Sequence, residues 1–239
     1  FDLRPGRGKP RIGIADSALH VFNHHMQIAA LCVALRDAIV SAVAADARVI
    51  VITGQGSSFC AGADLKAIAG GASDLGTERG GFAGIVRRDR HKPLIAALEG
   101  PAVAGGTEIV LACDLVVAAV TARFGLPEVK RSLIAAAGGL YRLPRALPRN
   151  VAMELALTGG DLDAAAAHRH GLVNRLVEPG QALEAAVNLA AEINQNAPLA
   201  VRASRRSILA TQLLDDDEAE RLVHRESRLV WRSDDFLEG

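Results

Sequence analysis

Two glutamates are the side chains of this sequence whose surroundings point most directly to chemistry. Glu108 lies in PAVAGGTEIVLACDL, residues 101–115, a segment that is almost wholly apolar and contains no basic residue. A buried carboxylate without a partner is costly or acquires a raised pKa, so this position needs a local partner, an unusual proton affinity or a catalytic role. Glu128 follows Pro127 in FGLPEVK.

Each of these segments also has an ordinary structural explanation. Glu108 follows two glycines and can stand in the first turn of a helix, where a carboxylate interacts well with the helix dipole and with free amides. Pro-Glu is equally common at a helix start or a turn, which covers Glu128. The stretch FCAGADL, residues 59–65, is typical of a tight connection with small side chains. Small residues there would also let a ligand approach exposed backbone N–H groups.

Taken together, the three segments suggest one arrangement. Two glycine turns at the carboxyl ends of strands can each point one backbone N–H at a common anion, while two nearby glutamates transfer protons. Such a site is an oxyanion hole beside an acid/base pair, and it serves to stabilise an enolate-like charge on a carbonyl oxygen. Thioesters suit this chemistry, because carboxylates can exchange their α-protons once the oxyanion is held.

The elements that must position these residues follow an α/β pattern. Residues 27–45 carry apolar side chains four apart, which predicts a helix, and RVIVITG, residues 48–54, predicts a buried strand. Strand-like runs at 92–100 and 115–120 flank a short helical segment at 104–114, which indicates crossover connections. The Gly-, Ser- and Asp-rich residues 55–81 are expected to form a functional loop.

The last third of the chain is predicted to be mostly helical. The pattern predicts a short strand in LVNRLV, residues 172–177, and helices near 138–147, 149–158, 163–170, 180–195, 198–213 and 215–232. We expect residues 1–176 to form the core with the active site and residues 177–239 to form a C-terminal helical region.

Bulk composition narrows the function classes. Lys plus Arg and Asp plus Glu number 27 each among 239 residues, so the net charge favours neither nucleic acid nor an anionic membrane as partner. Three well-separated cysteines match no metal spacing and predict a reduced, cytoplasmic compartment. No stretch approaches the ~18 to 20 uncharged residues of a spanning helix, and no signal-peptide pattern is seen at the start. Because residue 1 is Phe, we expect the sequence to be trimmed at its beginning.

Four stretches of the sequence resemble the crotonase, or enoyl-CoA hydratase/isomerase, superfamily. They are ITGQGSSFCAGADLK, KPLIAALEGPAVAGGTEIVLACDLVVAAVTARFGLPEVK, AAGGLYRLPR and MELALTGGDLDAAAAHRHGLVNRLV, in the order and spacing of that family. The resemblance implies a crotonase-type spiral of ββα units, with C-terminal helices that make contacts in a homotrimer. It also implies that two trimers can form a hexamer.

The resemblance further implies roles for single residues. The amides of Ala63 and Gly105 would form the oxyanion hole. Glu108 and Glu128 match the two hydratase carboxylates, which hold one water: the first helps deprotonate it for attack on C3, and the second exchanges a proton with C2. Coenzyme A would be part of the substrate, with no metal or redox cofactor, and its contacts are implied at Ala18, Leu19, Ala61, Asp64, Lys66 and Lys92.

The sequence also departs from the family pattern. A third glycine is common where Ala104 stands, Pro-Gly where Ala135-Ala136 stand, and Thr-Gln where Leu140-Tyr141 stand; these changes could reshape the acyl pocket. The first 25 residues match poorly, although SALHVFN, residues 17–23, resembles the stretch that lines the CoA adenine.

Some polar positions keep two explanations. The run RRDRHK, residues 87–92, could meet the CoA 3′-phosphate or form a solvated face. Asp64 and Asp114 also suit turn and helix-end positions.

The leading hypothesis is a cytoplasmic enoyl-CoA hydratase that adds water reversibly across the C2–C3 double bond of a 2-enoyl-CoA. The alternative is another CoA-thioester reaction on the same scaffold, such as double-bond isomerisation or dehydration of a 3-hydroxyacyl-CoA. A member that binds acyl-CoA or RNA without catalysis is a rival from another class. The helix with Arg202, Arg205 and Arg206 could be cited for RNA binding, but one basic helical face in a neutral protein is usually only solvated.

Overall fold

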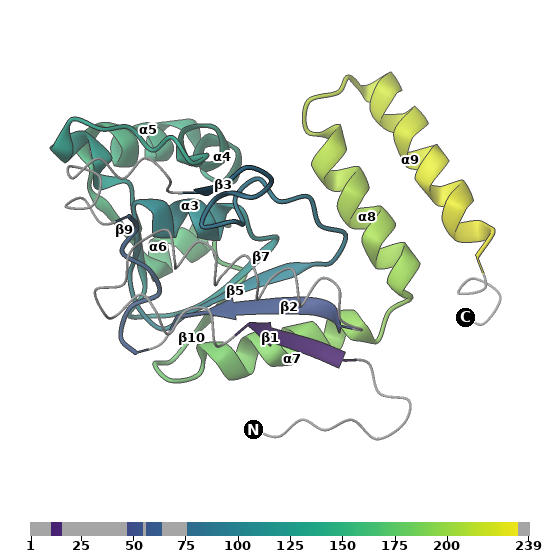
Figure 1. The fold of residues 1–239 in the computed structure, drawn as a ribbon, viewed down its shortest axis with the longest axis horizontal. Helices are drawn as coiled ribbons and strands as arrows, with labels where there is room; N and C mark the ends of the chain where they lie inside the picture. The colour runs from purple at the N-terminus through teal and green to yellow at the C-terminus, as the bar shows by residue number, and fades with distance from the viewer. Residues whose placement is uncertain (1–10, 16–46, 55, 64–75, 234–239) are drawn as a thin grey trace.

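A computed structural model describes residues 11–15, 47–54, 56–63 and 76–233, and all structural statements below concern these residues. Its main body contains a five-stranded sheet of order β1-β2-β5-β7-β10 (Figure 1). All neighbouring strands run parallel, which confirms the predicted α/β class. The strands are β1 (Arg11–Ala15), β2 (Ala47–Thr53), β5 (Leu94–Leu98), β7 (Leu115–Ala119) and β10 (Arg175–Val177).

The central strands are buried on both faces. In β2, Ile50 and Ile52 belong to the larger apolar cluster on one face, whereas Val49 and Val51 belong to the cluster on the other. A parallel strand covered on both sides needs such a continuous apolar run, because successive side chains point to opposite faces. The smaller cluster is covered by α7 (Ala182–Asn194), which packs along β2, β5 and β7.

The larger cluster is covered by the elements that build the candidate site. These are α3 (Gly105–Leu111), α4 (Gly139–Ala146), α5 (Arg149–Thr158), α6 (Ala164–Arg169), the 3-10 helix η1 (Pro127–Arg131) and a second sheet of order β6-β8-β9. That sheet consists of β6 (Ala102–Val103), β8 (Arg123–Gly125) and β9 (Asp161–Asp163). A two-stranded ribbon of β3 (Gly76–Thr77) and β4 (Gly81–Phe82) lies in the predicted functional loop.

The last two helices form a separate hairpin. Figure 1 shows α8 (Pro198–Thr211) and α9 (Asp216–Trp231) side by side, projecting from the body that holds the sheet. No residue of α9 is buried, and Ala203 is the one buried residue of α8. The hairpin and its turn therefore expose large apolar side chains: Leu199, Ile208, Leu209, Leu213, Leu214, Val223, Leu229 and Trp231.

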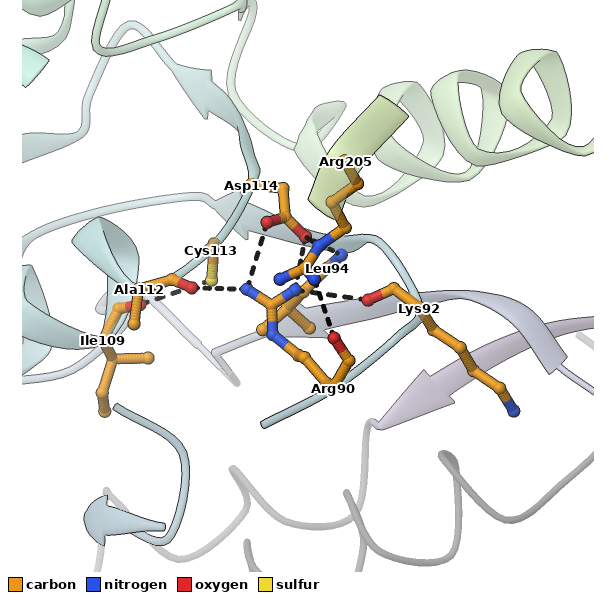
Figure 2. A network of polar contacts seen from close by, with 8 residues as sticks. All are labelled: Arg90, Lys92, Leu94, Ile109, Ala112, Cys113, Asp114 and Arg205. Carbon is orange, nitrogen blue, oxygen red and sulfur yellow. Dashed lines mark hydrogen bonds and ion pairs between the residues drawn. The ribbon is translucent and has the colours of Figure 1, made fainter. Parts of the chain in front are cut away.

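One polar network connects the hairpin to the body (Figure 2). The carboxylate of Asp114, between α3 and β7, accepts hydrogen bonds from the Arg90 guanidinium, from Leu94 N (2.8 Å) and from Arg205 Nε (2.9 Å). Arg90 also donates to the carbonyl of Ala112 at the end of α3 (2.6 Å), and its own carbonyl accepts from Arg205 Nη1 (2.7 Å).

This network corrects two expectations from the sequence. Arg90, from the basic run 87–92, is 6% exposed, so it does not lie on a solvated face. Its guanidinium is bound to Asp114 and to the Ala112 carbonyl rather than left open for a phosphate group. Arg205 is not merely solvated either, because it donates to Asp114 and to the Arg90 carbonyl. Asp114 does lie at a helix end, as expected, but it also joins three segments of the chain.

Most predicted elements after residue 90 are confirmed to within a few residues at each end. The strands β1, β3, β4, β6, β8 and β9 and the helix η1 were not predicted from the sequence. The predicted helix over 27–45 lies outside the described residues, and the division at residues 176 and 177 stays a prediction. None of the helices in the described ranges is both long enough and apolar enough to cross a membrane.

Candidate active site

Glu108 stands in the first turn of α3 and is 4% exposed. Its Oε1 accepts a hydrogen bond from the backbone N–H of Gly139 (2.9 Å), the first residue of α4. This donor amide lies 31 residues further along the chain than Glu108. Glycine is favoured at 139 because an added Cβ would lie 2.9 Å from Ala135 Cβ and 3.2 Å from Glu108 Oε1.

The surroundings of Glu108 raise its pKa above the ordinary value. Burial is the largest cause, and the charge of Glu128 acts in the same direction. Hydrogen bonds from the amides of Gly139 and Ala137 and the charge of Arg142 oppose this effect only in part. A carboxyl group with a raised pKa can both give and accept a proton closer to neutral pH.

Glu128 follows Pro127 in the first turn of η1. Burial also raises its pKa, partly offset by a hydrogen bond from its own backbone amide. Its Oε2 atom is buried, and none of the described residues forms a hydrogen bond with it. A buried polar atom without a protein partner calls for an explanation, and a place for substrate or for a reacting water supplies one.

The turn at residues 59–63 is held along the segment that leads into α3. The amides of Phe59 and Cys60 donate to the carbonyl of Pro101 (2.9 and 3.2 Å), and Val103 N donates to the carbonyl of Cys60 (2.9 Å). This parallel pairing brings Gly62, the residue before Ala63, against the N-terminus of α3. No described residue accepts a hydrogen bond from the amide of Ala63 or of Gly105.

Three glycines make this close approach possible. A Cβ on Gly62, whose φ is +85°, would lie 2.9 Å from Gly105 N. A Cβ on Gly105 would lie 2.5 Å from the ring of Phe82, and one on Gly106 would lie 2.2 Å from the carbonyl oxygen of Cys60. Contact between the two turns therefore requires glycine at 62 and 106, and the ring of Phe82 requires it at 105.

Cys60 is a buried, packed residue, 1% exposed. Burial raises the pKa of its thiol to about 12, and its Sγ accepts a hydrogen bond from Gly62 N (3.3 Å). A thiol that stays protonated is a poor nucleophile.

The structure describes only two of the six residues that were predicted to contact CoA. Ala61 is exposed in the 59–63 turn, whereas Ala18, Leu19, Asp64 and Lys66 lie outside the described residues. Lys92 is 8% exposed and precedes β5, at the opposite end of that strand from the connection to Gly105. The structure therefore does not place Lys92 beside the two glutamates. Its role in CoA binding stays a prediction that its position before β5 does not support.

Sequence reasoning missed two residues that contact this site. Phe82 of β4 covers Gly105, and Arg142 of α4 lies close enough to Glu108 for its charge to act on that carboxylate. A single arginine or phenylalanine carries no spacing signal, and Arg142 was present only inside the stretch AAGGLYRLPR.

Comparison with known proteins places this geometry in a family. A family model described as enoyl-CoA hydratase/isomerase matches residues 22–230. Enoyl-CoA hydratase EchA19 of Mycobacterium tuberculosis is 42% identical over 200 residues, covering 81% of this chain and 75% of the relative. Carnitinyl-CoA dehydratase of Salmonella arizonae is 41% identical over 199 residues, covering 80% and 76%.

The fold agrees with solved structures of the same kind. The crystal structure of an enoyl-CoA hydratase from Mycobacterium tuberculosis superposes with a TM-score of 0.84 at 48% identity, covering 88% of this chain and 83% of that one. Sequence and fold are thus matched over most of the chain. The chain belongs to the enoyl-CoA hydratase/isomerase, or crotonase, family.

Proposed function

We propose that this enzyme is a lyase that adds water reversibly across the C2–C3 double bond of a 2-enoyl-CoA thioester. The observation that carries the proposal is the pair of glutamates on α3 and η1, both buried enough to have raised pKa values and near enough for the charge of one to act on the other. The hydratase and dehydratase relatives support this reaction class.

In the proposed mechanism, the amides of Ala63 and Gly105 donate to the thioester oxygen. Negative charge develops on that oxygen when water attacks C3, so both hydrogen bonds strengthen in the transition state. Each such donor contributes about 3 to 4 kcal/mol to transition-state stabilisation in well-studied oxyanion holes. The contacts that bring the 59–63 turn against the start of α3 support this assignment.

Glu108 and Glu128 hold the attacking water between them in this proposal. Glu108 accepts a proton from the water as its oxygen attacks C3, and Glu128 delivers a proton to C2. The reverse steps eliminate water from the 3-hydroxyacyl product. The Oε2 of Glu128, which forms no hydrogen bond with the described residues, is the position we assign to a hydrogen bond with this water.

Coenzyme A is the carrier part of the substrate in this proposal. We assign contacts with it to Ala18, Leu19, Ala61, Asp64 and Lys66 from the family resemblance, and more weakly to Lys92. We also propose a cytoplasmic location, which the cysteine pattern favours; Cys60 and Cys113 are free thiols in the described part of the chain.

The direct test follows absorbance at the conjugated thioester band with 2-enoyl-CoA and 3-enoyl-CoA substrates in parallel. A hydratase removes the conjugation of the 2-enoyl substrate, whereas an isomerase creates conjugation from the 3-enoyl substrate. A graded series of acyl lengths, with carnitinyl-CoA added because of the dehydratase relative, identifies the acyl group. Isomerisation without any hydration would overturn the proposal, and RNA retardation without turnover would favour the binding alternative.

We further propose a homotrimer, or a dimer of such trimers, in which the α8–α9 hairpin is covered by neighbouring subunits. The exposed apolar side chains of this hairpin support the proposal, because monomers rarely leave so many on one element.

A further inference from the structure

The guanidinium of Arg142 lies against the turn that binds the Glu108 carboxylate. A Cβ added to Gly138 would come within 1.9 Å of Arg142 Nη1, so the guanidinium fills the space beside that residue. Gly138 has φ of +119° and directly precedes Gly139, whose N–H donates to Glu108. The missing side chain at 138 thus lets the arginine pack on the backbone of this turn.

Arg142 also ties this turn to another segment at the site. Its Nη2 donates to the carbonyl of Val86 (2.5 Å), and its Nη1 donates more weakly to the carbonyl of Ala137 (3.4 Å). Val86 is buried in the turn that follows Phe82, the residue whose ring covers Gly105. One guanidinium therefore holds the Glu108-binding turn against the segment that adjoins the oxyanion hole.

The side-chain environment keeps this guanidinium in place. It lies 4.8 Å above the ring of Tyr141, within the range of a cation–π contact. Burial lowers the pKa of Arg142, while Tyr141 and Glu108 act in the opposite direction. Arginine keeps its charge throughout the working range of an enzyme, so a permanent cation stands beside the acid/base pair.

We propose that Arg142 is a positioning residue for Glu108: it fixes the 137–139 turn that binds the carboxylate and holds a permanent positive charge beside that turn. The inference rests on the proposed hydratase function and deepens it. Two separable effects follow, one from geometry and one from charge. Loss of the geometry lowers kcat, and loss of the charge moves the acid limb of the pH profile.

The other charges around the pair are few. Glu108 is acted on by Glu128 from η1 and by Arg142 from α4; Arg142 is in turn acted on by Tyr141, Arg145 and Arg90. In the described part of the chain, Arg142 is thus the cation whose charge lowers the pKa of Glu108. Burial and the charge of Glu128 both raise the pKa of Glu108, and removal of Arg142 takes away a charge that lowers it. The pKa of Glu108 therefore rises in such a variant, and the acid limb of the pH profile moves to higher pH.

The test measures kcat and KM for a 2-enoyl-CoA from pH 5 to 9 in three variants. Arg142→Gln removes charge and hydrogen-bond geometry, and we expect kcat at pH 8 to fall roughly tenfold, KM to change less than about twofold, and the acid limb to move upward. Arg142→Lys keeps the charge, so its acid limb stays near the wild-type position although kcat is lowered. The matched control, Arg145→Gln, removes a more exposed arginine of the same helix and keeps a near wild-type profile.

The outcome that overturns the inference is an Arg142→Gln enzyme with wild-type kcat and a wild-type acid limb. If that variant does not fold, Arg142→Lys decides, because a wild-type kcat there removes the positioning role. Glu108→Gln is measured alongside: if it keeps wild-type turnover, the proposed function itself fails. If it loses turnover while the Arg142 variants behave as wild type, only the present inference fails.

Discussion

A backbone amide, rather than a cation, is the direct partner of the Glu108 carboxylate. This choice of partner has a chemical consequence. A bonded arginine would hold the carboxylate ionised and lower its pKa strongly, whereas an amide stabilises the charge enough for burial without preventing protonation. The apolar wall around Glu108 is therefore compatible with a group that must change protonation state in each turnover.

The first residue-scale prediction concerns the two carboxyl groups. Glu108→Gln and Glu128→Gln keep shape and volume but cannot exchange the proton, so we expect each to lower kcat by at least about 100-fold. Binding of a saturated acyl-CoA should remain, because the oxyanion donors are backbone groups. A hydration assay measures kcat, and calorimetric titration measures the binding of the saturated acyl-CoA. Near-normal turnover in both variants would contradict the assignment.

The second residue-scale prediction concerns stability. The folded-state pKa of Glu108 is raised above its ordinary value of 4.5, so the folded protein binds more protons than the unfolded chain as pH increases past that value. Stability is therefore lost as pH rises through the folded-state pKa. Glu108→Gln should raise Tm at pH 7.5 by about 2 °C or more, with a smaller gain near pH 4.5. The exposed Glu154→Gln serves as control, and an equal gain at both pH values would contradict the argument.

At the scale of elements, the contact between the 59–63 turn and α3 leaves no room for a methyl group at position 106. Gly106→Ala places a Cβ about 2.2 Å from the Cys60 carbonyl oxygen, so the turn must move away from the helix. We expect kcat to fall at least about tenfold, because a shift of this size misplaces an oxyanion donor. Gly160→Ala, where the added Cβ meets only the Thr158 hydroxyl, is the matched control; similar kcat values would exclude this role for the contact.

The Asp114 network predicts that breaking its ion pair lowers the free energy of unfolding much more than breaking an exposed ion pair does. Asp114→Ala leaves the buried Arg90 without its carboxylate, and breaking a buried pair costs about 3 kcal/mol or more of unfolding free energy. Arg206→Ala breaks the pair between α8 and Glu226 of α9, where the arginine is partly exposed, and should cost about 1 kcal/mol or less. Urea unfolding followed by circular dichroism compares them; equal midpoints would contradict this ranking.

Local patterns were sufficient to predict many of these elements. The β-branched run in β2 and the apolar periodicity of α5, α7, α8 and α9 carry strong local signals, so their positions could be predicted within a few residues. Strands of two or three residues, such as β6 and β9, carry no such signal, because long-range pairing alone defines them. The glycines beside Glu108 indicated a close approach, but not its partner.

The candidate site shows the same limit. Glu108 and Glu128 could be singled out because their types were unusual for their surroundings. The Gly139 amide and Arg142 could not, since the amide reaches Glu108 and the arginine's charge acts on it only after α4 has packed against α3. Likewise, the sequence could not reveal that Arg90, Asp114 and Arg205 meet, because such a pairing depends on tertiary packing rather than on spacing.

At the scale of the whole molecule, the exposed apolar side chains of α8 and α9 predict self-association. Leu213 is 76% exposed and Trp231 is 60% exposed, and both would be covered in the proposed trimer. We expect light scattering after gel filtration to give three or six times the mass of one chain, and Ile208→Asp with Leu229→Asp to reduce that mass. A wild-type protein that stays monomeric at micromolar concentration would contradict the proposed assembly.

The network at Asp114 also has a consequence for the order of events on the ribosome. Arg205 is synthesised 91 residues after Asp114 and 115 residues after Arg90. The emerging chain can therefore pair Arg90 with Asp114 early, yet the Arg90 carbonyl and one carboxylate bond must wait for α8. Translation that stops before α8 would release a body in which the Asp114 carboxylate and the Arg90 carbonyl each lack a hydrogen bond from Arg205, and quality-control proteases would meet it in that state.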